Sequence, residues 1–74
     1  AGPDPSRSVA LADAESAVGM ALGRLGDLPE ALAHHERAVD IGERLLAADP
    51  RHVNYRRSLM LGYSHIGDVK GFAG

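Results

Sequence analysis

The sequence contains no cysteine and no tryptophan, and only two tyrosines and one phenylalanine. Without cysteine the chain can form neither a disulfide framework nor a thiolate metal site, and a cytoplasmic location is the default expectation. Because aromatic rings are scarce, the apolar fraction of 45% is carried by alanine, leucine and valine. Such a core forms by close approach of small side chains, and this composition favours helices over sheets.

The sequence also lacks an excess of basic residues and a long apolar run. Its formal net charge is −2, with acidic and basic residues interleaved, so no nucleic-acid partner is expected. No apolar run approaches the ~20 residues of a membrane span, and the start of the chain, Ala1 to Pro5, lacks the parts of a signal peptide. We therefore expect no membrane partner.

The length of 74 residues leaves room for one small domain. Pro3 and Pro5 mark residues 1–5 as a frayed lead-in. Residues 6–74 are predicted to form a three-helix fragment of a longer chain, about one and a half repeats of a helical repeat protein.

The first helix break is predicted at Gly26 and Asp27. Gly26 is a typical residue just after a helix end, Asp27 a typical N-cap, Pro29 a first-turn residue, and Glu30 completes a capping box. This pattern predicts one helix over about 6–25 and a second over 28–48.

The second break is predicted at Asp49 and Pro50, which repeat the cap-plus-proline signature and would start a third helix running toward Ala73. The predicted fold is all-α: an antiparallel helix hairpin plus a third helix. The apolar residues expected to recur on the second helix are Leu28, Ala31, Leu32, His35, Ala38, Val39, Leu45 and Leu46. The first helix carries Val9, Leu11, Val18 and Leu22, and the third carries Val53, Leu59, Met60, Tyr63, Ile66 and Val69.

An internal repeat can be aligned in two registers. An offset of 48 residues, from Gly19 to Gly67, superposes three glycines and also aligns Leu11 with Leu59. An offset of 41 residues, from Gly26 to Gly67, aligns fewer residues. We prefer the first register and keep the second as an alternative.

Small residues at the expected helix contacts give the chain a resemblance to the tetratricopeptide repeat family. The residues that carry it are Val18-Gly19 and Ile66-Gly67 at the helix contact, Gly26-Asp27 at the turn, Ala31 and Ala38 on the second helix, and Asp49-Pro50 at the next unit. The family period is ~34 residues, so an offset of 48 would correspond to a seven-residue extension of each helix, which nearly preserves the buried face.

Segments 43–50, 55–57 and 66–69 look like the long-helix tetratricopeptide arrays of large bacterial signalling proteins, often linked to a kinase or cyclase domain. The resemblance implies a non-enzymatic scaffold or adaptor fragment that binds a protein or peptide. The alternative is a structural spacer or self-association element with no dedicated ligand. A small catalytic or ligand-binding helical domain ranks third.

The histidines and serines give no recognisable catalytic or metal-binding pattern. Neighbouring side chains on a helix, such as His34 and His35, point about 100° apart and cannot both face one ion. Ser16, Ser58 and Ser64 lie within predicted helices and not on a strand-to-helix elbow. We expect no enzymatic activity, no metal and no cofactor. We expect His35 to pack in the core and the other histidines, His34, His52 and His65, to be solvated.

The resemblance implies that the first helix of each unit lines a groove that receives an extended peptide or a helix. The positions implied as partner-binding are Asp13, Ser16, Met20 and Arg24 on the first helix and Leu61, Ser64, Asp68 and Phe72 on the third. They do not offer the Lys and Asn pair with which some family members grip a C-terminal carboxylate.

The third helix has apolar residues on more than one face, and no later helix is present to cover them. Met60, Tyr63 and Ile66 are therefore predicted to form a self-association surface, most simply in a two-fold dimer. Gly19, Ala31 and Ala38 are predicted to sit at close contacts between helices.

Overall fold

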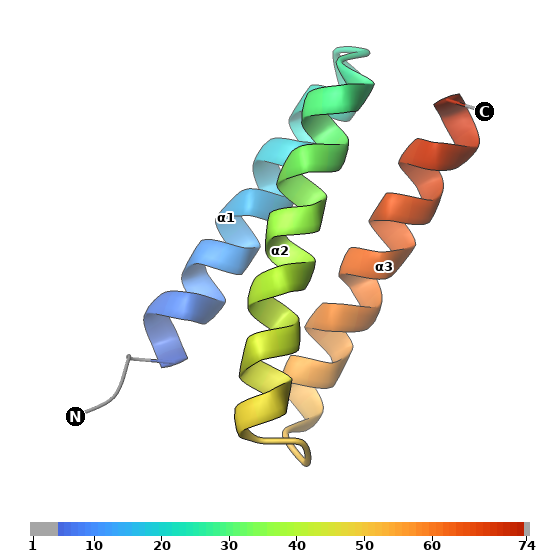
Figure 1. Cartoon of the computed structure of the whole chain (residues 1–74). Helices are drawn as coiled ribbons and strands as arrows, with labels where there is room; N and C mark the ends of the chain where they lie inside the picture. The colour runs from blue at the N-terminus through green and yellow to red at the C-terminus, as the bar shows by residue number, and fades with distance from the viewer. Residues whose placement is uncertain (1–4, 74) are drawn as a thin grey trace.

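The computed structural model describes residues 5–73, with the side chains of residues 5–71, and this range forms three α-helices (Figure 1). They are α1 (Pro5–Arg24), α2 (Leu28–Ala48) and α3 (Val53–Ala73). The chain is elongated, measuring 40 × 18 × 13 Å. The predicted all-α fold, an antiparallel hairpin plus a third helix, is confirmed.

The turn between α1 and α2 has the predicted glycine and the predicted N-cap, but the Asp27 N–H is bonded to Leu22 and not to the side chain of Glu30, the predicted capping-box residue. Gly26 has a φ of 87°, a left-handed conformation that glycine adopts without strain. The Asp27 N–H donates to the Leu22 carbonyl at 3.0 Å, which ties the turn to the end of α1. The Asp27 side chain accepts a hydrogen bond from the Glu30 N–H at 3.4 Å. Asp27 is thus the N-cap of α2, as predicted.

Removing this cap is expected to weaken the hairpin. Asp27→Ala leaves the Glu30 amide without its side-chain acceptor and should lower the free energy of unfolding by about 1 kcal/mol. Asp27→Asn keeps an acceptor oxygen and should cost less. Urea denaturation of the two variants measures the difference, and equal stabilities for both variants and the unsubstituted chain would contradict the assignment.

The turn between α2 and α3 differs from the prediction, because Asp49 closes α2 and does not cap α3. The Asp49 N–H still donates to the Leu45 carbonyl at 3.0 Å, and Pro50 lies in the turn that follows. His52 caps α3, since its Nδ1 lies 3.4 Å from the Tyr55 backbone N–H. The prediction that the third helix starts at Pro50 is therefore wrong.

The start of α1 also differs from the prediction by one residue. Pro5, assigned to the lead-in, is the first residue of α1, a position where its missing N–H costs no hydrogen bond. The rest of the predicted lead-in, residues 1–4, lies outside the described residues.

Helix α2 is the centre of the fold. Both α1 and α3 pack along it and barely touch one another, as Figure 1 shows. The buried apolar residues are Ala12, Ala31, Ala38, Val39, Leu59 and Val69, and His35 is buried with them. None of these side chains is larger than leucine or histidine, so dense packing of the core requires the helix backbones to approach one another closely.

Glycines make this approach possible. A Cβ added to Gly19 would lie 2.7 Å from Cε1 of His35, and one added to Gly62 would lie 2.7 Å from a Val39 methyl. Gly19, Ala31 and Ala38 are all buried, as their predicted place at helix contacts requires.

The buried face of α1 is not the one that hydropathy suggests. Leu11 and Val18 are 55% and 43% exposed, while Ala12 and Gly19 face α2. The larger side chains would hold α1 farther from α2, so the small residues occupy the contact. This leaves an apolar strip of α1 uncovered.

Candidate functional site

An open cleft of about 320 Å³ lies between the C-terminal half of α1 and α3. We call it the His35 cleft, because His35 of α2 is among the residues that line it. Its full lining is Gly19, Met20, Gly23, Arg24, Leu28, His35, His65, Asp68 and Val69. Three of the predicted partner-binding residues, Met20, Arg24 and Asp68, meet here.

Two histidine rings lie at this cleft. His35 is only 2% exposed, and its ring centroid lies 4.9 Å from that of His65 on α3, with the planes tilted by 40°. The Nδ1 atoms of both rings are buried and have no hydrogen-bond partner among the described residues. Burial, and then the charges that His65 and His34 carry when protonated, lower the pKa of His35 below its usual value. The site therefore favours a neutral His35 ring.

The prediction that His35 packs in the core is confirmed, but the prediction that the other histidines are solvated is wrong. His34, His52 and His65 are all partly buried. His65 contacts His35, His52 stacks on Tyr55, and the His34 Nδ1 lies 3.5 Å from a carboxylate oxygen of Glu15.

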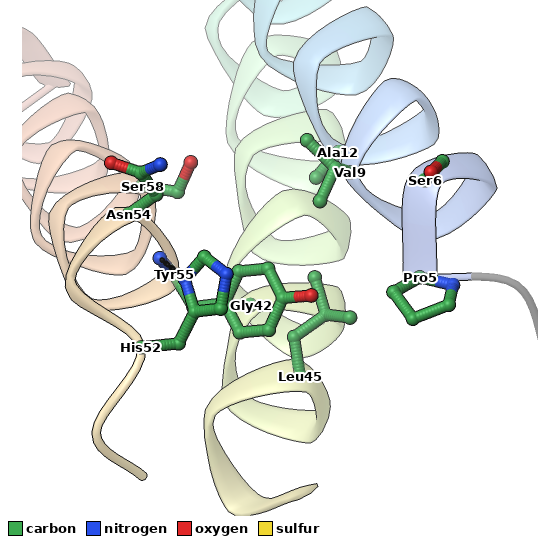
Figure 2. A pocket seen from close by; sticks show the side chains of 10 residues that line it. All are labelled: Pro5, Ser6, Val9, Ala12, Gly42, Leu45, His52, Asn54, Tyr55 and Ser58. Atoms are coloured by element: carbon green, nitrogen blue, oxygen red, sulfur yellow. Dashed lines mark hydrogen bonds between the residues drawn. The ribbon is translucent and has the colours of Figure 1, made fainter. Parts of the chain in front are cut away.

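A second cleft, of about 380 Å³, opens at the other end of the molecule between the start of α1 and the start of α3. We call it the Tyr55 cleft. Its lining is Pro5, Ser6, Val9, Ala12, Gly42, Leu45, His52, Asn54, Tyr55 and Ser58. Figure 2 shows the rings of His52 and Tyr55 reaching from α3 toward Leu45 of α2, with Val9 and Ala12 on the α1 side.

None of the predicted partner-binding residues with a described side chain lines the Tyr55 cleft. In this cleft the ring of His52 stacks on the ring of Tyr55, with ring centroids 3.6 Å apart and ring planes 7° apart. The scarcity of aromatic residues could have singled out Tyr55, one of two tyrosines. The stack depends on α3 starting at Val53 and not at Pro50, the predicted start.

The remaining predicted partner-binding residues are dispersed. Asp13, Leu61 and Ser64 are exposed and line neither cleft, and Ser16 is partly buried on α1. The side chain of Phe72 lies outside the described residues. The structure thus groups a minority of the predicted set.

The predicted self-association residues do not share one environment. Met60 is 65% exposed. Tyr63 is 49% exposed, and its hydroxyl donates a hydrogen bond to the Glu43 carboxylate of α2, which raises the pKa of Tyr63. Ile66 is partly buried. Of the three, only Met60 faces solvent without a polar anchor.

A small charged cluster joins α1 to α2 on another side. A Glu15 carboxylate oxygen lies 3.5 Å from the His34 Nδ1 and 3.7 Å from an Arg37 guanidinium nitrogen. The Glu15 side chain is 17% exposed, so this carboxylate interacts more strongly than a fully solvated one. The cluster borders a shallow cleft of about 570 Å³ that includes Leu11 and Ile41.

Metal-binding clusters and serine–histidine pairs are two arrangements of side chains that can perform chemistry. Among residues 5–71 no three His, Asp or Glu side chains gather in a metal-binding arrangement. Within the same range, none of the hydroxyl groups of Ser16, Ser58 and Ser64 is hydrogen-bonded to a histidine. Over its described length, none of the three helices has the run of apolar residues that crossing a bilayer requires.

Comparisons with protein-family models, curated proteins and solved structures find no match to this chain. The resemblance to tetratricopeptide repeats is therefore carried by the residues quoted above alone. Because one fold can host many functions, the function has to be argued from the site.

Proposed function

We propose that this chain is a non-enzymatic protein-interaction module, similar to a tetratricopeptide repeat unit, that binds a segment of another protein in the His35 cleft. The observation that carries the proposal is the composition of that cleft. Apolar Met20, Leu28 and Val69 surround it, while Arg24 and Asp68 supply one charge of each sign. Mostly apolar surfaces with a few placed polar groups are typical of binding sites.

Exposed apolar side chains support a binding role more generally. Among residues 5–71, eight large apolar residues are at least 43% exposed. They are Leu11, Val18, Met20, Leu25, Val53, Met60, Leu61 and Tyr63. Exposed apolar surface beyond that of an ordinary monomer marks interaction sites.

The cleft favours a partner segment with one apolar side chain flanked by charges. The apolar side chain would lie over Gly23 beside Met20, because nothing lies within 4 Å of the position that a Gly23 Cβ would occupy. A basic group of the partner would face Asp68 and an acidic group would face Arg24. This arrangement fixes orientation more than affinity.

Peptides selected from a random display library test this proposal. Met20→Glu places a charge beside the apolar wall and should weaken peptide binding at least about tenfold, as measured by calorimetry. Ala17→Glu, which introduces the same charge at an exposed position of the same helix outside the cleft, is the matched control and should leave the affinity unchanged. Failure to select any peptide, or equal binding by Met20→Glu, would contradict the proposal.

The alternative function is self-association or spacing within a repeat array, and it is favoured by the uncovered surface of α3. On the same resemblance, we propose that the module belongs to a cytoplasmic signalling protein of bacterial type. Residues 43–50 and 66–69 support this placement.

A further inference from the structure

The outward face of α3 is uncovered along its described length. We define this face by Val53, Arg57, Met60, Leu61, Ser64 and Asp68, all of which are exposed. Asp68 lies at the edge of the face, because it also lines the His35 cleft. Val53, Met60 and Leu61 are 68%, 65% and 53% exposed. The spacing from residue 57 to 61, 64 and 68 is that of a helix-pairing stripe.

The two charges of this face have no ion-pair partner within the described residues. Arg57 and Asp68 take part in none of the ion pairs of residues 5–71, whereas the adjacent Arg56 donates to the Pro50 carbonyl at 3.2 Å. They lie three turns apart on the same side of α3, about 16 Å along the axis. Between them the face is apolar or uncharged.

This placement is self-complementary in one orientation only. If two copies of α3 pair antiparallel about an axis at the level of residues 62 and 63, Arg57 of each copy lies opposite Asp68 of the other, and Leu61 lies opposite Ser64. Parallel pairing would bring Arg57 against Arg57 and Asp68 against Asp68. Like charges placed together disfavour an interface, and opposite charges select register and orientation.

The glycines beside the face allow two helices to approach. Nothing lies within 4 Å of where a Cβ would stand at Gly67 or Gly71. In the preferred repeat register, Gly67 is equivalent to Gly19 of α1, and the ring of His35 packs against Gly19. α3 therefore has the small-residue surface of a packed helix, but it lacks the packed partner.

We infer that a second copy of this chain docks on the outward face of α3, antiparallel to it, with Arg57 of each copy paired to Asp68 of the other. This inference deepens the self-association alternative. Because Asp68 also lines the His35 cleft, a second copy and a bound peptide would compete for its carboxylate. Apolar contact of Met60 and Leu61 holds the copies together, and the two ion pairs fix the orientation.

Sedimentation equilibrium of charge-swap variants tests the pairing. The full chain is expected to dimerise, and Met60→Glu is expected to weaken the dimer at least about tenfold. Arg57→Asp and Asp68→Arg should each weaken it several-fold, and the double variant should restore the original dissociation constant. Asp13→Arg, an equal charge change on α1, should have no effect. Circular dichroism checks that each variant stays helical.

Spin labels on introduced cysteines test the orientation, since the chain has no cysteine of its own. Labels at Val53→Cys should lie about 28 Å apart along the paired helices in the antiparallel dimer, whereas parallel helices would place them side by side. A monomer at all concentrations, a double swap that fails to restore the dimer, or adjacent labels would each overturn the inference. Peptide binding by the monomeric Met60→Glu variant is measured separately, so failure of the dimer leaves the proposed function standing.

Discussion

Gly19→Ala is expected to lower the free energy of unfolding by about 1–3 kcal/mol, although alanine normally strengthens a helix. The added methyl group would lie 2.7, 2.8 and 2.9 Å from the Cε1, Nε2 and Nδ1 atoms of His35. The His35 ring cannot move freely, because it is 2% exposed and packs against His65. Either α1 moves away from α2 or the histidine leaves its rotamer.

A glycine one turn later in α1 is the matched control. Apart from its chain neighbours and the nearby backbone of α1, no described atom lies within 4 Å of the Cβ position of Gly23, so Gly23→Ala should stabilise the chain by roughly 0.5–1 kcal/mol through helix propensity. The two substitutions have the same chemistry and opposite expected signs. Urea denaturation followed by circular dichroism measures both, and a stabilised Gly19→Ala variant would show that α1 does not approach α2 as described.

The first turn is predictable from the sequence because its determinants are local. Gly26 supplies the left-handed residue and Asp27 the cap within a few positions of one another. Asp49 and Pro50 offer similar residue types, yet α3 begins at Val53. An aspartate between two helices ends the first helix when its own N–H still takes part in the hydrogen bonds of that helix. The Asp49 N–H is bonded to the Leu45 carbonyl, so Asp49 belongs to the end of α2.

The contact face of α1 is harder to predict because hydropathy and packing disagree there. Leu11 and Val18 have the strongest apolar character, but Ala12 and Gly19 make the contact, since the distance between helices is set by the smallest residues that fit.

The candidate site is predictable only in part. The repeat alignment assigns Met20, Arg24 and Asp68 to one partner-binding set, and the structure brings these three residues to the His35 cleft. They meet there because each lies near the C-terminal end of its helix. The same prediction places Leu61 with them, but in the structure Leu61 is exposed and lines neither cleft. The contact of His35 with His65 joins two helices, and no local pattern in either helix indicates it.

The buried histidine pair predicts a loss of stability in mild acid. The pKa of His35 in the folded chain is lowered from 6.5 by burial, by His65 and by His34. The unfolded chain therefore binds this proton more readily than the folded chain. The neutral His35 ring therefore contributes its full stabilising effect above the unfolded pKa of 6.5, and this effect is lost as the pH falls below that value. A single proton limits the slope to about 1.4 kcal/mol per pH unit.

The other charged groups near this pair do not remove the effect. From α1, Arg24 shares the cleft with His35, and from α3, Asp68 does so as well. The Asp68 carboxylate makes no hydrogen bond to either histidine within the described residues, and the Nδ1 atom of His35 has no partner of any kind there. A proton placed on His35 would therefore be a buried charge without an acceptor at that atom.

Melting temperatures measured between pH 7.5 and 5.5, where exposed carboxylates stay ionised, test this expectation. The unsubstituted chain should lose stability steadily as the pH falls through that range. His35→Phe keeps a ring in the core but cannot be protonated, so its pH dependence should be much flatter. His65→Gln, at a partly buried position, removes one of the neighbouring charges and should flatten the dependence less. His52→Gln lies at the distant Tyr55 cleft and should change only the overall stability. A pH profile of His35→Phe as steep as that of the unsubstituted chain would assign the acid sensitivity to another group.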